Sequence, residues 1–240
     1  MASSAEDEIE ETETTAVEEE GIESLTNLKE LDLYDNRISD IENFKTLANL
    51  ESLDLSFNKI RDIKNLEYLE NLTNIYFVQN KITKIENLGH LKKLINLELG
   101  ANRIRNLENL KNLNILSIQS NRITKLKGLE GLINLEEIYL SHNGIKKLEG
   151  FENNLKLRVI DISNNFINKL ENISHLKNLE EFWASNNQLS DFEELDSQLK
   201  NLENLTTVYF EGNPIQSENQ ATYRLKVKTY LPQLKQIDAT

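Results

Sequence analysis

The sequence predicts an α/β repeat fold, a solenoid in which short parallel strands line a concave side and turns or short helical segments form a convex wall. Two observations predict it. A pattern L-x-x-L-x-L-x-x-N-x-I-x-x-I returns from residue 28 onward, and successive asparagines of the pattern are separated by 22, 22, 22, 19, 22, 22, 22 and 26 residues. These asparagines are Asn36, Asn58, Asn80, Asn102, Asn121, Asn143, Asn165, Asn187 and Asn213.

Each position of the pattern has a physical role, as the second copy shows. Leu53 and Leu55 alternate with period two, which points both side chains off one face of a strand into the core. Asn58 follows where the chain turns, and its amide can bond the backbone groups that a turn leaves unpaired. Ile60 and Ile63 are three residues apart, which favours a short 3₁₀ or helical segment. Together these features are the signature of a leucine-rich repeat, with one strand per coil and a concave parallel sheet.

Two intervals depart from the 22-residue period. The 19-residue interval between Asn102 and Asn121 lacks three residues of the convex wall, and the 26-residue interval before Asn213 adds four around residues 194–199. Because both changes fall on the convex side, we expect the strands to stack without interruption and the curvature to change locally.

The chain divides into three parts. Residues 1–20 hold nine acidic residues and neither Lys nor Arg, so we predict a disordered acidic tail that solvates the chain or binds a basic surface. Residues 21–215 form the array of about nine leucine-rich repeats. Residues 216–240 form a C-terminal cap, with an amphipathic helix from Tyr223 that ends before Pro232 and an apolar strand-like tail, because the last coil of a solenoid otherwise exposes its core.

Composition excludes several functions. A net charge of −13 argues against nucleic acid and anionic membranes as partners, and the absence of cysteine fits a reducing compartment. We find no signal peptide and no apolar run near the ~20 residues that span a bilayer. The three histidines share no ligand spacing, and no nucleophile motif or phosphate-binding loop occurs. We therefore expect a soluble, intracellular, non-catalytic protein without metal or cofactor.

Candidate binding residues come from the alternation of the strands. Four residues before each asparagine, the side chain faces the concave surface, and this row reads Asp32, Asp54, Tyr76, Glu98, Ser117, Tyr139, Asp161, Trp183 and Tyr209. Exposed aromatic residues among acids are typical of protein interfaces, and the acids favour a partner with a basic patch. For the three tyrosines, β-propensity and cross-strand stacking are an equally good explanation. For Trp183, whose neighbour on the core side is only Ala184, an interface is favoured.

Particular stretches carry a family resemblance over residues 21–240. LKELDLYDNRI (28–38), LEEIYLSHNGI (135–145), ENISHLKNLEEFWASNN (171–187) and LPQLKQIDAT (231–240) resemble the protein phosphatase 1 regulatory subunit 7 family, of which this chain would be a shortened or divergent member. The resemblance implies a non-catalytic subunit of the nucleus and cytoplasm that binds the protein phosphatase 1 catalytic subunit through its concave face, together with a small phosphatase inhibitor subunit. The partner-binding residues that it implies are Asp54, Tyr76, Glu98, Asp161, Glu181, Trp183 and Tyr209.

One alternative stays open at this point. The same architecture serves as an adaptor in other protein complexes, such as a splicing particle or an axonemal scaffold. An adaptor of that kind would bind a different protein and ignore the phosphatase.

Overall fold

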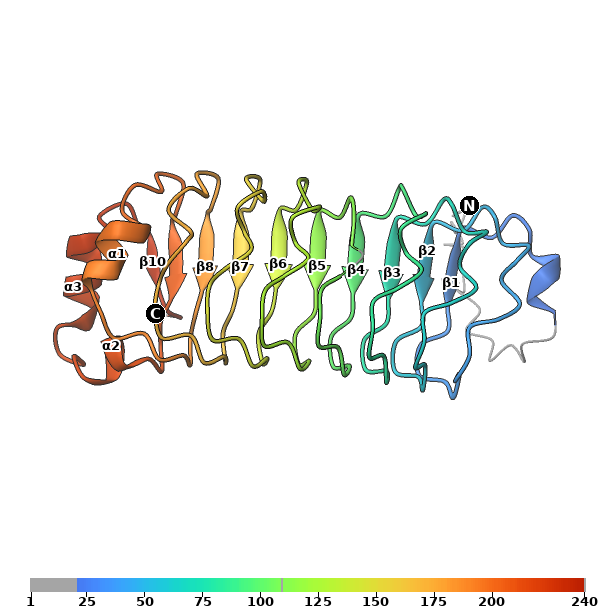
Figure 1. The fold of residues 1–240 in the computed structure, drawn as a ribbon, viewed down its shortest axis with the longest axis horizontal. Helices are drawn as coiled ribbons and strands as arrows, with labels where there is room; N and C mark the ends of the chain where they lie inside the picture. The colour runs from blue at the N-terminus through green and yellow to red at the C-terminus, as the bar shows by residue number, and fades with distance from the viewer. Residues whose placement is uncertain (1–20, 109, 240) are drawn as a thin grey trace, which may run out of the picture.

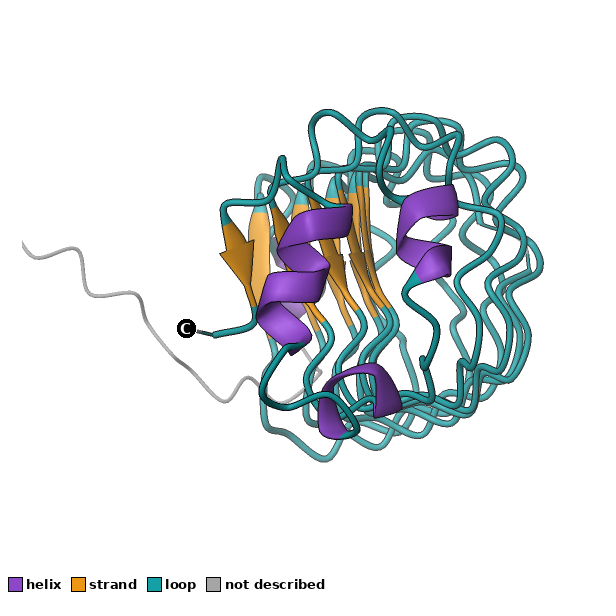
Figure 2. Ribbon diagram, turned by 90° about the vertical axis from the view of Figure 1, so that its left-hand side faces the viewer, coloured by secondary structure: helices purple, strands orange, loops and turns teal. Residues whose placement is uncertain are grey.

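Residues 21–108 and 110–239 are described by a computed structural model, in which ten parallel strands form a single sheet in chain order. The strands lie side by side along the long axis of the molecule (Figure 1), and each coil carries its strand on one side and turns on the other (Figure 2). The acidic tail predicted for residues 1–20 lies outside the described residues.

The elements follow one another with a nearly constant period. The strands are β1 (Glu30–Asp32), β2 (Ser52–Asp54), β3 (Asn74–Tyr76), β4 (Asn96–Glu98), β5 (Ile115–Ser117), β6 (Glu137–Tyr139), β7 (Val159–Asp161), β8 (Glu181–Trp183), β9 (Thr207–Tyr209) and β10 (Gln236–Ile237). The helices are η1 (Ile22–Ser24), α1 (Glu193–Gln198), α2 (Pro214–Ser217) and α3 (Tyr223–Tyr230).

The middle residue of each strand from β2 onward points into the core. Leu53, Ile75 and Leu97 are fully buried and are register partners in the sheet, while the residues on either side of them are half-buried. This is the alternation that the sequence predicts, and the leucine-rich-repeat solenoid with a concave parallel sheet is confirmed.

The asparagines of the pattern connect neighbouring coils, and we call them the ladder asparagines. Asn143, which is 8% exposed, donates through Nδ2 to the carbonyl oxygens of Ile118 (3.2 Å) and Leu140 (3.0 Å). Its Oδ1 accepts the backbone N–H of Ile123 at 3.0 Å. The same bonds recur in the coils before and after it. The ladder asparagines inside the array therefore pair backbone groups that the turns would otherwise leave buried without partners, whereas Asn36 at the N-terminal end is exposed.

The residue before each ladder asparagine adopts a left-handed backbone conformation. Its φ lies between 53° and 58° in Asp35, Phe57, Gln79, Ala101, Ser120, His142, Asn164 and Asn186. This conformation costs about 1 kcal/mol or more in a residue other than glycine, and it persists where the surroundings fix it. The left-handed conformation turns the chain out of the strand, and His142 is one of the residues that make this turn.

The convex wall consists of single turns with the 3₁₀ hydrogen-bond pattern. In the second interval, Leu69 N–H donates to Leu66 O (3.0 Å) and Leu72 N–H donates to Leu69 O (3.1 Å), so the wall has separate turns there and no continuous helix. The short interval leaves β4 and β5 paired, with Asn96 beside Ile115, and the long interval is taken up by α1 on the outer wall. The expectation that the strands stack through both intervals is confirmed.

One row of the wall is occupied by asparagine in most coils and by glycine in the two coils after the short one, at Gly128 and Gly150. Asn65 and Asn172 have positive φ and donate through Nδ2 to a carbonyl 24 residues earlier, at 2.6 and 2.8 Å. Gly128 occupies the equivalent place beyond the short coil with a φ of 89°. A Cβ atom on Gly128 would lie 2.0 Å from the carbonyl oxygen of Leu107. Here the backbone itself approaches the carbonyl that an asparagine side chain reaches in other coils.

The C-terminal end of the core is covered by α3 and β10 (Figure 2). Tyr223 and Val227 of α3 are buried, and Ile237 of β10 pairs with Val208 of β9. Asp238 accepts the N–H groups of Phe210 (2.8 Å) and Glu211 (3.1 Å) through Oδ1. This carboxylate therefore bonds the turn after β9.

Candidate protein-binding site

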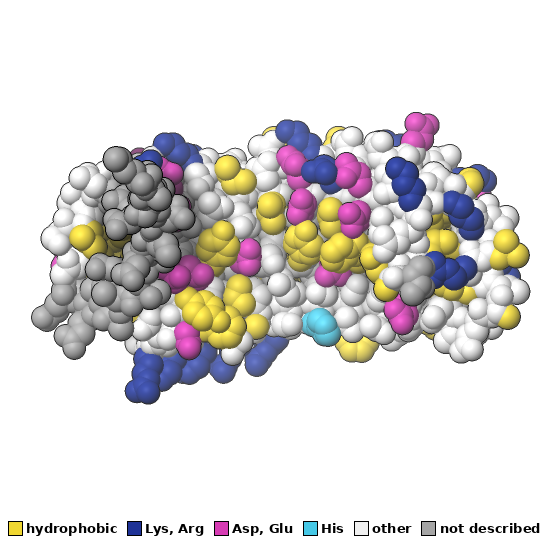
Figure 3. Space-filling view, turned by 180° about the vertical axis from the view of Figure 1, so that it is seen from behind, with side chains coloured by type: hydrophobic (Ala, Val, Ile, Leu, Met, Phe, Trp, Pro, Cys, Tyr) yellow, Lys and Arg dark blue, Asp and Glu magenta, His cyan; other side chains and the backbone are white. Residues whose placement is uncertain are grey.

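All seven predicted binding residues lie on the concave face. Asp54, Tyr76 and Glu98 are register partners on β2, β3 and β4. Asp161, Trp183 and Tyr209 are register partners on β7, β8 and β9, and Glu181 begins β8. Figure 3 shows hydrophobic and acidic side chains gathered on this face. The structure thus places six of the seven residues in one row, with Ser117 and Tyr139 between its two halves, and Glu181 two residues before Trp183 on the same strand.

The C-terminal half of the row forms an aromatic cluster of Tyr139, Trp183 and Tyr209. The Trp183 ring lies 6.1 Å from the Tyr139 ring and 5.8 Å from the Tyr209 ring, both in edge-to-face geometry. Tyr139 and Trp183 belong to strands that are two positions apart, which is about 9.6 Å between backbones. Their rings therefore lean toward each other across β7.

Asp161 lies on β7 between these two rings and is only 8% exposed. The alternation predicted a side chain at the concave surface, and the structure places Asp161 there in register between Tyr139 and Trp183, with little of it exposed. Its Oδ1 accepts the backbone N–H of Ser163 at 2.9 Å. Asp54 likewise accepts the N–H of Ser56 at 2.7 Å. Both carboxylates thus hold the turn that follows their strand.

The polar atoms of the aromatic cluster are fixed by neighbours. Trp183 Nε1 donates to Glu181 at 2.9 Å, and the Tyr139 hydroxyl donates to Glu137 at 2.8 Å. Burial raises the pKa of Tyr139, and the hydrogen bond to Glu137 raises it further, so this phenol stays protonated at neutral pH. Gln236 of the cap donates to the Tyr209 hydroxyl at 2.7 Å. Sequence reasoning missed Gln236 because the cap does not follow the repeat pattern.

A small cavity opens beside the cluster. It has a volume of about 220 Å³ and is lined by Ser163, Trp183, Ser185 and Tyr209. A space of this size suits one inserted side chain. The aromatic walls and nearby carboxylates favour a cationic or aromatic side chain, which is the chemistry of an interface anchor.

The N-terminal half of the concave face has a second aromatic contact. The rings of Tyr34 and Phe57 lie 4.8 Å apart, and Tyr34 is 49% exposed. Phe57 escaped the sequence analysis because it occupies the left-handed turn position after the strand. Between this pair and the aromatic cluster lies Ser117, which is buried and donates to Gln119 at 2.7 Å. The Tyr34–Phe57 pair and the aromatic cluster thus lie on opposite sides of Ser117 along the sheet.

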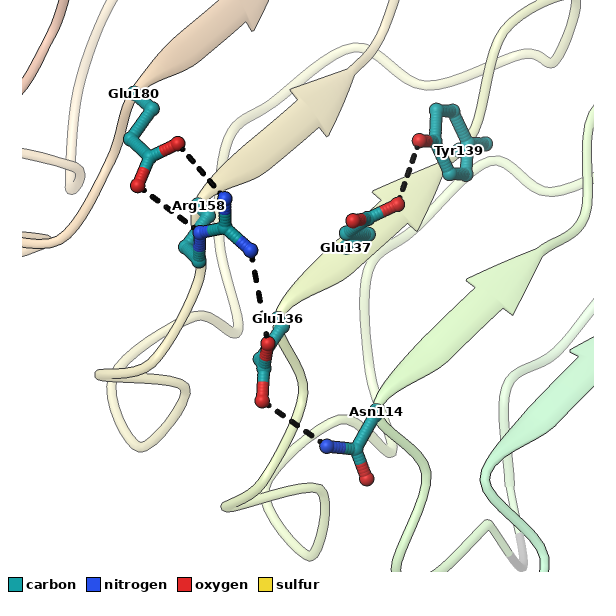
Figure 4. A network of polar contacts seen from close by, with 6 residues as sticks. All are labelled: Asn114, Glu136, Glu137, Tyr139, Arg158 and Glu180. Atoms are coloured by element: carbon teal, nitrogen blue, oxygen red, sulfur yellow. Dashed lines mark hydrogen bonds and ion pairs between the residues drawn. The ribbon is translucent and has the colours of Figure 1, made fainter.

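A polar network runs along the edge where the strands begin (Figure 4). Asn114 donates to Glu136 at 3.0 Å, Arg158 lies 3.9 Å from Glu136, and Arg158 donates two bonds of 3.0 Å to Glu180. The hydrogen bond from the Arg158 guanidinium lowers the pKa of Glu180. These groups are exposed, so they add little stability. The ion pairs of this network hold charged side chains in fixed positions at the edge of the sheet beside the aromatic cluster.

Two of the three histidines, His90 and His175, connect successive coils. His90 donates through Nε2 to the Leu66 carbonyl at 2.9 Å, and His175 donates to the Phe151 carbonyl at 3.1 Å. In the described ranges 21–108 and 110–239, no group of three or more His, Asp or Glu side chains is placed to hold a metal ion. Over the same residues, no helix has the length and hydrophobicity needed to cross a bilayer.

A curved array of strands with an aromatic and acidic concave row defines the class of molecule, a repeat protein that presents one face of its sheet as a binding surface. Residues 26–68, 111–153 and 155–197 match the family model described as leucine-rich repeats (2 copies). These stretches make up more than half of the chain, which therefore belongs to the leucine-rich-repeat family.

Two curated relatives are both named protein phosphatase 1 regulatory subunit SDS22. The chain is 60% identical over 52 residues to the protein of Schizosaccharomyces pombe, which covers 22% of this chain and 16% of that protein. It is 52% identical over 50 residues to the protein of Saccharomyces cerevisiae, which covers 20% and 15%. The matches span about one sixth of the relatives' length. The predicted resemblance to phosphatase regulatory subunits is confirmed over these segments.

Solved structures share the fold over most of the chain. An internalin (inlF) from Listeria monocytogenes superposes with a TM-score of 0.79 at 25% identity, covering 91% of this chain and 63% of the internalin. A leucine-rich-repeat protein of Leptospira interrogans superposes with a TM-score of 0.69 at 28% identity, covering 90% and 62%.

Proposed function

We propose that this chain is a non-catalytic regulatory subunit that binds the catalytic subunit of protein phosphatase 1 through its concave face. The observation that carries the proposal is the aromatic cluster, whose rings contact one another and whose polar atoms bond Glu137 and Glu181. The similarity to the two SDS22 proteins supports the identity of the partner.

The geometry favours a partner that presents a basic patch to the cluster. The carboxylates of Glu137 and Glu181 lie beside the rings and are half-buried, so they attract cationic side chains of the partner and keep them close to aromatic faces. The rings supply rigid apolar area that loses little conformational freedom on binding. Trp183, at the centre of the cluster, is the expected anchor.

The test is a binding measurement between the purified chain and the purified phosphatase catalytic subunit. Loss of an anchor costs about 2 kcal/mol or more, so Trp183→Ala with Glu181→Ala should weaken binding at least ~30-fold. Phe166→Ala is the matched control, since Phe166 is 51% exposed and follows its ladder asparagine, outside the concave row. Equal affinity of the double variant and the wild type would refute the concave-face model.

A second pair of substitutions tests the N-terminal half of the row. Tyr76→Ala with Glu98→Ala should weaken binding of the phosphatase if the partner spans the short coil. Unchanged affinity would confine the interface to β6–β9. We further propose a ternary complex with a small phosphatase inhibitor subunit and residence in the nucleus and cytoplasm, which co-purification and fluorescence imaging of the tagged chain test.

A further inference from the structure

A row of basic side chains follows the strands of the first five coils, on the edge of the sheet opposite the network of Figure 4. Each residue comes directly after a ladder asparagine. We call the five the basic row: Arg37, Lys59, Lys81, Arg103 and Arg122. In the next four coils the same position holds Gly144, Phe166, Gln188 and Pro214, so the row itself ends after the fifth coil, while Lys147 and Lys169 continue the basic residues of the adjoining turns. A run of Lys and Arg side chains is visible along the lower edge of the molecule in Figure 3.

The backbone sets the spacing of this row. The N–H groups of Lys59, Lys81, Arg103 and Arg122 each donate to a carbonyl of the preceding coil at 2.8 to 2.9 Å. The positions therefore follow one another at about the strand spacing of 4.8 Å, and the row spans about 19 Å. Four more exposed basic side chains lie on the adjoining turns, namely Arg61, Lys84, Arg105 and Lys125.

These nine cations lack acidic partners. Within residues 21–108 and 110–239 none of them forms an ion pair, although Lys29, Lys64, Arg158 and Lys200 do. Acids are few on this edge, since residues 78–85, 100–107 and 118–127 contain neither Asp nor Glu. Asp35, Asp40 and Asp62 lie in the corresponding turns of the first two coils, so the acid-free part of the edge is confined to the third to fifth coils. In a chain with a net charge of −13, this part differs in charge from its surroundings.

The complementary charge occurs in the same chain. Residues 6–20 contain nine acids and no base, which leaves a net charge of −4 for residues 21–240. The segment joins the array at Gly21. This residue occupies, one coil earlier, the repeat position of Asn43, because the buried Ile22 that follows it corresponds to the buried Phe44 that follows Asn43. Arg37, the first member of the basic row, precedes Asn43 by only six residues. Fifteen extended residues reach about 50 Å, more than twice the length of the row.

We propose that the acidic segment 6–20 binds the basic row of its own chain and covers it. Single exposed ion pairs contribute little, but nine opposite charges on a tether act at an effective concentration in the millimolar range. The contact would pair the basic row and its adjoining turns with acids that the third to fifth coils lack.

Carbodiimide cross-linking of the full chain tests this contact, because it joins a carboxylate to a lysine amine only where the two touch. Mass spectrometry should find residues 6–20 linked to Lys59, Lys81, Lys84 or Lys125 at low salt. The links should fall at least tenfold in 1 M salt, where the Debye length is about 3 Å. They should also fall in the triple variant Lys81→Glu, Arg103→Glu, Arg122→Glu.

Three exposed lysines on the opposite edge provide the matched control. Lys92→Glu, Lys111→Glu and Lys177→Glu together make the same change in charge and should leave the links intact. Links that are spread evenly over all exposed lysines would overturn the proposal. So would links that join two chains in a mixture of light and heavy isotopes, because a second copy would then be the occupant.

Discussion

Replacing one ladder asparagine in the middle of the array tests how much these side chains contribute to stability. In Asn143→Ala the backbone N–H of Ile123 loses its acceptor, and Ile123 is fully buried. The carbonyls of Ile118 and Leu140 each keep a donor from a neighbouring ladder asparagine. The substitution therefore leaves one buried donor unpaired, which costs about 1–3 kcal/mol. Including the weaker loss at the shared carbonyls, we expect about 2–3 kcal/mol.

Asn36→Ala is the matched control at the N-terminal end. Asn36 is exposed and donates to the carbonyls of Leu33 and Tyr34, and the Leu33 carbonyl keeps a bond from Asn58. No buried group loses its only partner, so the expected cost is about 0.5 kcal/mol or less.

Urea denaturation followed by circular dichroism measures both variants. Hydrogen exchange adds a local readout, because the Ile123 amide should exchange faster in Asn143→Ala. A loss of stability in Asn143→Ala that does not exceed the loss in Asn36→Ala would refute the argument that the asparagines stabilise the coils by pairing buried backbone groups.

Two further predictions concern the convex wall. Gly128→Ala should destabilise the chain by about 2–4 kcal/mol, because φ is 89° and the new Cβ would meet the Leu107 carbonyl. Gly131→Ala is the control and should have little effect in the same denaturation assay, because a Cβ there would lie 3.5 Å from its nearest atom. Burial raises the pKa of Glu194, so its proton is held more tightly in the folded chain, and the ionised carboxylate opposes folding at neutral pH. Glu194→Gln should therefore raise the melting temperature at pH 7 and lose this advantage near pH 4; a lower melting temperature at pH 7 would contradict it.

The fold could be predicted almost completely because its physics is local and repeated. Alternation within three strand residues decides which side chains enter the core, and Leu53, Ile75 and Leu97 follow it. The ladder asparagines could be assigned a role because a turn always leaves backbone groups unpaired. The left-handed residue before each asparagine was not predicted, since residues as different as Phe57 and Ala101 occupy it.

For the candidate site, the sequence predicted the face on which the side chains lie but not the contacts between them. The two-residue alternation of the strands correctly predicted that Asp161, Trp183 and Tyr209 lie on one face. It could not show that the rings of Tyr139 and Trp183 meet across β7, because side-chain rotamers decide that contact. Asp161, in register between Tyr139 and Trp183, is a largely covered carboxylate that bonds Ser163. For the proposed interface we therefore expect Trp183 to contribute more direct contact area than Asp161, which is only 8% exposed.

The side chains along the concave row, and not the length of the short coil, separate the aromatic residues of the concave face into two groups. Because β4 and β5 remain paired, the loss of three wall residues leaves the sheet continuous and removes nothing from the concave row. What changes at this point is the side chain, since the buried hydroxyl of Ser117 stands between acidic Glu98 and aromatic Tyr139. The sheet thus holds two separate groups of aromatic rings at a fixed distance on one rigid support. A partner that contacts both groups must match this spacing, and selectivity for that partner can arise from the spacing as well as from the rings.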